Sequence, residues 1–254
     1  MRNIWFIRHG ESEGNAGLPS ISSGSPPLTL KGREQALHVS KFIQKEPDLI
    51  VTSSFIRTQE TAAPTIEKFP NVPIETWPVE EFTYLSSPTY VNTTIPQRRS
   101  AGIKYWRKGN PDHNDGPGAE SFNDLFNRVQ QTLKLIKENN SKYILVFSHG
   151  WFMRAMIYTL FTHANGKLEY QPDIVRQLRK DRYISSLIYA YFSIRKIPPE
   201  KRKMLHYLAF ASTFQIPNTA IMKFESGDND SIKFIEKHTD HLPASLRGNF
   251  ILDR

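Results

Sequence analysis

Strand-like and helix-like segments alternate along the first 160 residues, and this alternation most constrains the fold. Apolar runs typical of buried strands occur at Asn3–Ile7 (NIWFI), Asp48–Ser54 (DLIVTSS) and Tyr143–His149 (YILVFSH). VPIETW at Val72–Trp77 is a further strand candidate. Since helical periodicity separates these runs, we predict an α/β fold: a three-layer α/β/α sandwich with a mostly parallel central sheet.

Helix boundaries are marked by capping residues. Thr29 is placed to cap a helix over Leu30–Glu46, and Ser121 opens an S-x-x-D capping box before an apolar periodicity that starts at Phe122. Two more helices are expected directly after strands, over Arg57–Phe69 and Gly150–Phe161.

We interpret residues 1–254 as a single domain with two insertions. The first, at about 86–118, is rich in Pro, Gly, Asn, Ser and basic residues, and the second, at about 166–212, is helical, basic and aromatic. Thr219–Phe224 and Ser231–Glu236 read as closing strands, with a hairpin turn at 227–230.

Composition excludes several classes of site. The chain has no cysteine, which removes disulfides, thiolate nucleophiles and Cys-based metal sites. No apolar run reaches the about 18 residues of a membrane span, and the N-terminus lacks a signal-peptide pattern, so we expect a cytoplasmic protein without a membrane span.

The net charge of +8 is unevenly distributed, because Gly166–His206 holds ten Lys or Arg against four Asp or Glu. A basic surface favours anionic partners. No nucleic-acid-binding motif accompanies it, so nucleic acid is not expected as a partner.

Two histidines each end a predicted strand and are followed by glycine. His9 ends the first strand and His149 ends YILVFSH, so a parallel sheet would bring both imidazoles to the same carboxyl edge. One histidine in such a place is more often incidental than functional, but two in the same local context favour a site.

Arginine and asparagine add phosphate-binding groups at that edge. Arg8 adjoins His9, Arg57 follows the strand DLIVTSS, and Asn15 lies six residues after His9. Guanidinium groups match phosphate oxygens in a bidentate way. One imidazole could attack phosphorus, and the other could donate a hydrogen bond to a phosphoryl oxygen.

At these residues the chain resembles the histidine phosphatase superfamily, the phosphoglycerate mutase-like branch with an RHG motif. The matching segments, in the family's order, are RHGESEGN (Arg8–Asn15), PLTLKGREQA (Pro27–Ala36), TSSFIRTQETA (Thr52–Ala62), GAESFNDLFNRV (Gly118–Val129), FSHGWFMRAMI (Phe147–Ile157) and PNTAIMKF (Pro217–Phe224).

The resemblance implies a phosphoglycerate mutase-like fold and a role for each matched residue. His9 matches the phosphorylated nucleophile, and Arg8, Arg57 and His149 match the rest of the phosphate pocket. Asn15 and the Gly150 backbone match further phosphate contacts. The resemblance implies no metal and no cofactor.

Glu81 matches the family's proton donor best by register, while Glu80 and Glu120 are competing candidates. A neighbouring carboxylate can raise the pKa of its partner, which would help one of the pair stay protonated. A solvated acidic pair is the alternative interpretation.

Metal-independent hydrolysis of a phosphomonoester is the favoured function. A mutase is the first alternative, but VEEFTYLSS stands where such mutases usually show RLNERHYG. A non-catalytic regulatory or binding member is the second. The first insertion carries Arg98, Arg99, Lys104, Arg107 and Lys108 beside Tyr105 and Trp106. It could hold a second anionic group or stack an aromatic residue on a ring, and a solvated basic loop is the alternative interpretation. The substrate could be a small molecule or a phosphoprotein, and the oligomeric state is left open.

Overall fold

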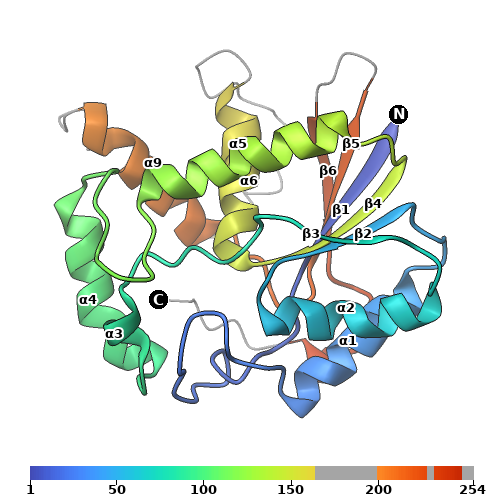
Figure 1. Cartoon of the computed structure of the whole chain (residues 1–254), viewed down its shortest axis with the longest axis horizontal. Helices are drawn as coiled ribbons and strands as arrows, with labels where there is room; N and C mark the ends of the chain where they lie inside the picture. The colour runs from blue at the N-terminus through green and yellow to red at the C-terminus, as the bar shows by residue number, and fades with distance from the viewer. Residues whose placement is uncertain (164–198, 228–231, 248–254) are drawn as a thin grey trace.

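The computed structural model describes residues 1–163, 199–227 and 232–247, whose strands form one mixed sheet between two layers of helices (Figure 1). The strand order is β3-β2-β4-β1-β5-β6. The first four of these strands run parallel, and β5 and β6 pair antiparallel at one edge. The strands are β1 (Arg2–Arg8), β2 (Leu49–Thr52), β3 (Ile74–Thr76), β4 (Tyr143–Ser148), β5 (Ile221–Ser226) and β6 (Ile232–His238). The expected three-layer α/β fold is confirmed.

Alternating side chains of the central strands divide the interior into two cores. Ile4 and Phe6 of β1 face one core, and Ile7 faces the other. The same division holds in β4, where Ile144 and Val146 face the first core. Because successive strand residues point to opposite faces, a strand buried on both sides must be apolar throughout. This accounts for the continuous apolar runs in the sequence.

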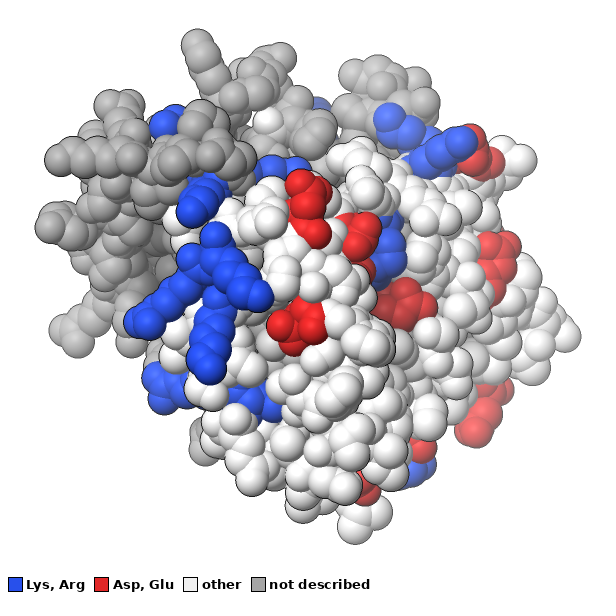
Figure 2. Space-filling model, turned by 60° about the vertical axis from the view of Figure 1, so that its left-hand side comes forward, with Lys and Arg blue, Asp and Glu red and all other residues white. Residues whose placement is uncertain are grey.

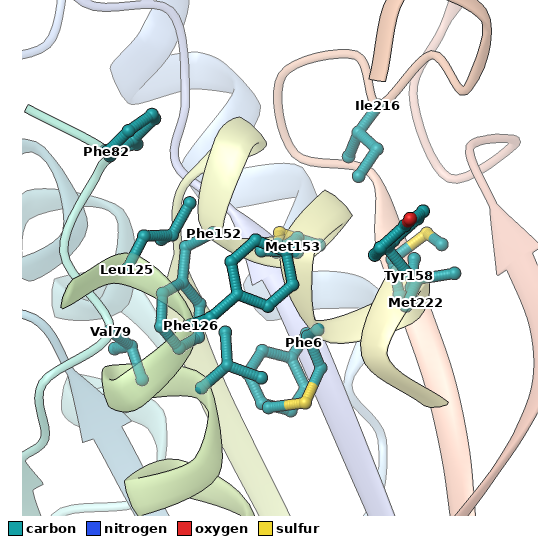
Figure 3. Close-up of a cluster of buried hydrophobic side chains, with 14 of the residues drawn as sticks. Phe6, Val79, Phe82, Leu125, Phe126, Phe152, Met153, Tyr158, Ile216 and Met222 are labelled. Atoms are coloured by element: carbon teal, nitrogen blue, oxygen red, sulfur yellow. The ribbon is translucent and has the colours of Figure 1, made fainter. Parts of the chain in front are cut away.

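Each core is covered by its own helices. Helices α1 (Leu30–Phe42) and α2 (Ile56–Lys68) cover the smaller core, and α5 (Phe122–Glu138), α6 (Gly150–His163) and α9 (Pro199–Thr213) cover the larger one. Figure 3 shows part of the larger core, to which Phe6, Phe126 and Phe152 belong. The short helix η1 (Ala244–Leu246) contacts α1.

The predicted caps are confirmed, and one helix is shorter than predicted. Thr29 Oγ1 accepts a hydrogen bond from Gly32 N, and Ser121 and Asp124 form a capping box. Helix α1 ends at Phe42 rather than at Glu46. Pro47 follows Glu46, and the residue before a proline is disfavoured in helical conformation, so the chain leaves the helix early.

The third strand and the first insertion also differ from the prediction. The strand is limited to the exposed edge residues Ile74–Thr76. The insertion contains α3 (Ser87–Tyr90) and the 14-residue α4 (Ile95–Lys108), which ends at the left-handed Gly109. Only Gly102, Tyr105 and Trp106 of α4 are buried, so the apolar periodicity is too sparse to reveal this helix in the sequence.

Tyr105 is 1% exposed, so the expectation that it stacks on a substrate ring is wrong: it belongs to the core.

Of the second insertion, α9 supplies the described part, and residues 166–198 lie outside the described residues, as does most of the predicted hairpin turn. In the described ranges, no helix combines the length and the apolar character that a membrane crossing requires.

A close backbone contact joins the loop after β1 to the start of α1. A Cβ atom on Gly32 would lie 2.1 Å from the Glu11 carbonyl oxygen, and one on Gly10 would lie 2.6 Å from the Gly32 carbonyl oxygen. The obstructing atoms are backbone, so relief would require the loop itself to move.

We therefore expect Gly32→Ala to lower the free energy of unfolding by about 1–3 kcal/mol, the usual cost of overpacking. Urea denaturation measures this, with Glu34→Ala, an exposed position on the same helix, as the control. Equal stability of the two variants would show that the loop adapts without strain.

Candidate functional site

The register of β1 and β4 brings the two strand-end histidines together. Arg8 pairs with Ser148, so the next residues, His9 and His149, emerge side by side at the carboxyl edge of the sheet. Their ring centroids lie 5.1 Å apart. The side chains of both are almost fully buried, at 2% and 0% exposure.

The tautomer of His9 follows from its hydrogen bonds. Nδ1 lies 2.7 Å from the Gly10 carbonyl oxygen, which can only accept, so Nδ1 carries the proton. Nε2 is then unprotonated and accepts a hydrogen bond of 3.2 Å from Arg57 Nε. The lone pair of Nε2 is thereby oriented, as an imidazole nucleophile requires.

Two buried guanidinium groups flank the imidazoles. Arg57 Nη1 donates to the Ser23 carbonyl oxygen at 2.8 Å, and Arg8 Nη1 donates to the Ile216 carbonyl oxygen at 2.6 Å. These contacts hold the side chains without neutralising their charge, since a carbonyl oxygen is not an anion.

His149 is held by a hydroxyl group. Its Nε2 lies 2.8 Å from Oγ of Ser53, the residue that follows β2. Ser53 Oγ also lies 2.8 Å from Thr58 Oγ1. The other ring nitrogen, Nδ1, is buried and has no hydrogen-bond partner among the described residues. A buried polar atom without a partner is costly, which points to a ligand group that completes the site.

Burial and positive charge keep both rings neutral. Burial lowers the pKa of His9 well below its usual value, and the charges of Arg57 and Arg8 lower it further. Burial also lowers the pKa of His149, with contributions from Arg57 and His9. A neutral His9 needs no separate base before it attacks an electrophile.

Asn15 and Gly150 complete the set of predicted phosphate-binding residues. Asn218 Nδ2 donates to Asn15 Oδ1 at 3.1 Å, which orients the Asn15 amide with Nδ2 as its donor. A Cβ atom on Gly150 would lie 3.1 Å from Arg154 Nη1 and 3.4 Å from Arg8 Nε, so the glycine leaves room for two guanidinium groups at the start of α6.

A pocket of about 1100 Å³ opens beside His9. His9, Asn15, Arg57 and Glu81 line it. Arg8, His149 and Gly150 are adjacent to these residues but do not line the pocket. Helices α3, α4, α6 and α9 supply most of the remaining wall.

The three candidate carboxylates have different surroundings. Glu120 makes two contacts with Arg128, at 2.6 and 2.9 Å, and Glu80 accepts hydrogen bonds from Ser54 and lies 3.7 Å from Arg128. Glu81 Oε1 accepts a hydrogen bond of 2.8 Å from Trp151 N at the start of α6. Of the three, Glu81 alone lines the pocket.

Three residues near the site were not singled out from the sequence. Arg154 is buried, lines the pocket and lies on α6 with its Nη1 3.1 Å from the position of a Gly150 Cβ. Its spacing of four from Gly150 places both on one helix face, a signal that could have found it. Ser53 and Asn218 act through contacts across long sequence separations, which no local pattern reveals.

Clusters of three or more His, Cys, Asp or Glu side chains suited to a metal ion do not occur within residues 1–163, 199–227 and 232–247. The positive charge of the site comes from its arginines instead.

Comparison with known proteins identifies the family of this site. A family model described as the histidine phosphatase superfamily (branch 1) matches residues 4–172. The chain is 30% identical over 181 residues to 6-phosphofructo-2-kinase/fructose-2,6-bisphosphatase 4 of Rattus norvegicus, with 66% of this chain and 35% of that protein covered. It therefore spans about a third of the length of that relative.

Two further proteins are similar. The chain is 29% identical over 167 residues to a Serratia proteamaculans protein named "Probable phosphoglycerate mutase GpmB", with 63% of this chain and 75% of that protein covered. The crystal structure of a phosphoserine phosphatase from Entamoeba histolytica has a TM-score of 0.62 at 21% identity, covering 96% of this chain and 100% of that one. At this identity the last comparison supports the fold alone.

The lowered pKa values predict a pH-dependent stability. Below about pH 6.5 the unfolded chain binds protons that buried His9 and His149 do not, so stability falls as pH falls, by about 1.4 kcal/mol per pH unit for each histidine. The loss continues until the folded-state pKa of each ring is reached. Urea unfolding between pH 7.5 and 5 in phosphate-free buffer measures the slope.

In the same series, the His9→Asn variant should show a pH dependence of stability that is smaller by about 1.4 kcal/mol per pH unit, the contribution of one histidine. The slope of the wild type is the reference for the variant. Burial also lowers the pKa values of His206 and His241, but these two residues contribute equally to the slopes of both proteins. Identical slopes would mean that His9 is protonated in the folded state.

Proposed function

This chain belongs to branch 1 of the histidine phosphatase superfamily, and on that premise we propose that it hydrolyses phosphomonoesters through a phosphohistidine on His9, without a metal ion. The observation that carries the proposal is the state of His9. Its ring is buried and neutral, its Nε2 is oriented by Arg57, and it lines a pocket flanked by cationic side chains.

In the first step, His9 Nε2 attacks phosphorus, the N–P bond forms and the P–O bond to the alcohol breaks. The phosphoryl oxygens take over the hydrogen bond that Arg57 now donates to His9. Arg8, Arg57 and Asn15 then hold the phosphoryl group, as preorganised donors do for the charge of a transition state.

His149 contributes as a neutral donor. When Ser53 Oγ donates to Nε2, the ring proton lies on Nδ1, the nitrogen that lacks a partner among the described residues. A phosphoryl oxygen accepts that proton in a hydrogen bond and so satisfies the buried atom. Its place 5.1 Å from the His9 ring is consistent with this role.

Glu81 serves as the acid and then as the base. Protonated Glu81 gives its proton to the departing alkoxide, and the resulting carboxylate takes a proton from the water that attacks the phosphohistidine. Inorganic phosphate leaves and His9 is restored. Glu81 is favoured over Glu80 and Glu120 because those two are held by Arg128 and Ser54 and do not line the pocket.

We expect His9→Ala to reduce phosphate release by on the order of 10³-fold or more, since it removes the nucleophile. The assay measures inorganic phosphate from a panel of sugar phosphates, nucleotides, phosphoglycerates and a phosphopeptide, in EDTA. Far-UV circular dichroism checks that the variant is folded. Equal activity in wild type and variant would exclude His9 as nucleophile, and turnover that EDTA abolishes would exclude the metal-independent reaction.

The Glu81→Gln substitution should slow the hydrolysis of alkyl phosphates by about 10²-fold or more. It should slow the hydrolysis of p-nitrophenyl phosphate much less, because nitrophenolate leaves without a proton. Glu80→Gln, a neighbouring carboxylate outside the pocket wall, is the matched control and should not produce this difference. If Glu80→Gln shows the leaving-group dependence and Glu81→Gln does not, the acid has been assigned to the wrong residue.

A further inference from the structure

The pocket beside His9 is large and mainly apolar for a site that binds phosphate. Its volume of about 1100 Å³ lies slightly above the usual range for small-molecule sites. Of the proposed phosphate-binding residues, His9, Asn15 and Arg57 form part of its wall. The rest of the pocket must receive the alcohol portion of the substrate, so the character of that part bears on specificity.

An aromatic wall begins at the proposed acid. Trp151, whose backbone N–H holds Glu81, stacks on Trp106 with ring centroids 5.6 Å apart and an interplanar angle of 21°. Tyr84 lies 5.7 Å from the Trp106 ring and 6.3 Å from the Trp151 ring. All three line the pocket. An alcohol that departs next to Glu81 therefore departs into a pocket with an aromatic wall.

This wall is held rigidly. Tyr207 Oη donates to the Trp151 carbonyl oxygen at 2.7 Å, and the Tyr207 ring packs against Trp106 and Phe122. Trp106 is only 8% exposed, so its orientation is set by the core. A preformed aromatic surface binds a flat apolar group at a low cost in conformational entropy.

Apolar side chains from two other helices line the same pocket. Leu205 and Leu208 come from α9 and Ile103 comes from α4, where it is 42% exposed. Covering an exposed aliphatic side chain on a pocket wall removes apolar surface from water, which favours binding of an apolar ligand. The contribution from the first insertion thus lies in the shape of an apolar cavity as well as in its charge.

The basic residues at this pocket do not discriminate between phosphate esters. Figure 2 shows Lys and Arg side chains gathered on the side of the molecule that carries α4 and α9. Arg99 and Arg107, both exposed on α4, line the pocket. Such charges attract every phosphomonoester, so specificity must come from the wall that the alcohol contacts.

We propose that the substrate of this enzyme is a phosphomonoester whose alcohol portion carries an aromatic ring, bound against Trp151, Trp106 and Tyr84. The proposal rests on the proposed phosphatase function and adds the substrate class. Small hydrophilic esters such as glycerol 3-phosphate and 3-phosphoglycerate leave this surface uncovered and are poor substrates.

The test compares esters with nearly equal leaving groups, so that only contacts with the pocket differ. The substrates are 2-phenylethyl, 2-cyclohexylethyl and ethyl phosphate, with glycerol 3-phosphate as the polar reference. We expect kcat/KM for the phenylethyl ester to exceed that for the ethyl ester by about tenfold or more, as burial of a ring implies. The kcat/KM for cyclohexylethyl phosphate should lie between these two values.

A matched pair of variants locates the effect. Ile103→Asn removes an apolar side chain from the wall, and Leu37→Asn removes one that is 50% exposed on α1, away from the pocket. Ile103→Asn should lower the ratio of phenylethyl to ethyl turnover by about threefold or more, and Leu37→Asn should leave it unchanged. Both positions are exposed, so neither change threatens folding.

The outcomes separate the two proposals. If the kcat/KM for ethyl phosphate or glycerol 3-phosphate equals that for phenylethyl phosphate, and the reaction depends on His9, the substrate class is wrong and the phosphatase function stands. Equal turnover of the cyclohexylethyl and phenylethyl esters also overturns it, in favour of a general apolar preference. If no ester shows His9-dependent turnover, the proposed function itself fails.

Free phosphotyrosine and a phosphotyrosyl peptide share one leaving group and distinguish two sources of the same chemistry. Higher kcat/KM for the free amino acid supports a small aromatic substrate, and higher kcat/KM for the peptide supports a protein side chain. Either result retains the aromatic ring, whereas failure of both together with phenylethyl phosphate overturns the proposal.

Discussion

The parallel pairing of β1 with β4 is the constraint on which the site depends. It sets Arg8 opposite Ser148, so that His9 and His149 emerge at the same level of one sheet edge with their rings 5.1 Å apart. A shift of one residue in this register would turn every side chain of β1 to the other face. The two apolar cores prevent such a shift, because Ile4 and Phe6 fit one core and Ile7 fits the other. The packing that stabilises the fold therefore also sets the geometry of the site.

The electrostatics follow from burial at that edge. The imidazoles are withdrawn from water beside Arg8 and Arg57, and the resulting environment favours neutral rings and an anionic ligand. Carbonyl oxygens of Ile216 and Ser23 hold the two guanidinium groups in position while preserving their charge. Glu81 is placed differently, at the N-terminal end of α6, where the Trp151 N–H holds it at the rim of the pocket. Cationic and acidic functions are thus separated by their places in the fold.

Much of the pocket wall comes from a segment whose sequence shows no clear periodicity. Helix α4 lies in a region rich in Pro, Asn and basic residues, yet it places Trp106 against Trp151 and buries Tyr105 in the core. The aromatic wall therefore combines side chains from an insertion with a helix that follows a central strand.

The sequence by itself determined the layers of the fold and the residues that meet at the sheet edge. Continuous apolar runs specify strands buried on both faces, the caps at Thr29 and Ser121 specify helix starts, and a histidine at the end of each of two such strands specifies their meeting. Only the tertiary structure decided which carboxylate faces the pocket, because Arg128 of α5 engages Glu80 from far along the chain as well as the nearby Glu120. It also decided the orientation of His149 and Asn15, through Ser53 and Asn218, and the course of α4. Local patterns report the periodicity of a segment, whereas these features depend on contacts between residues far apart in the chain, which no short window of sequence contains.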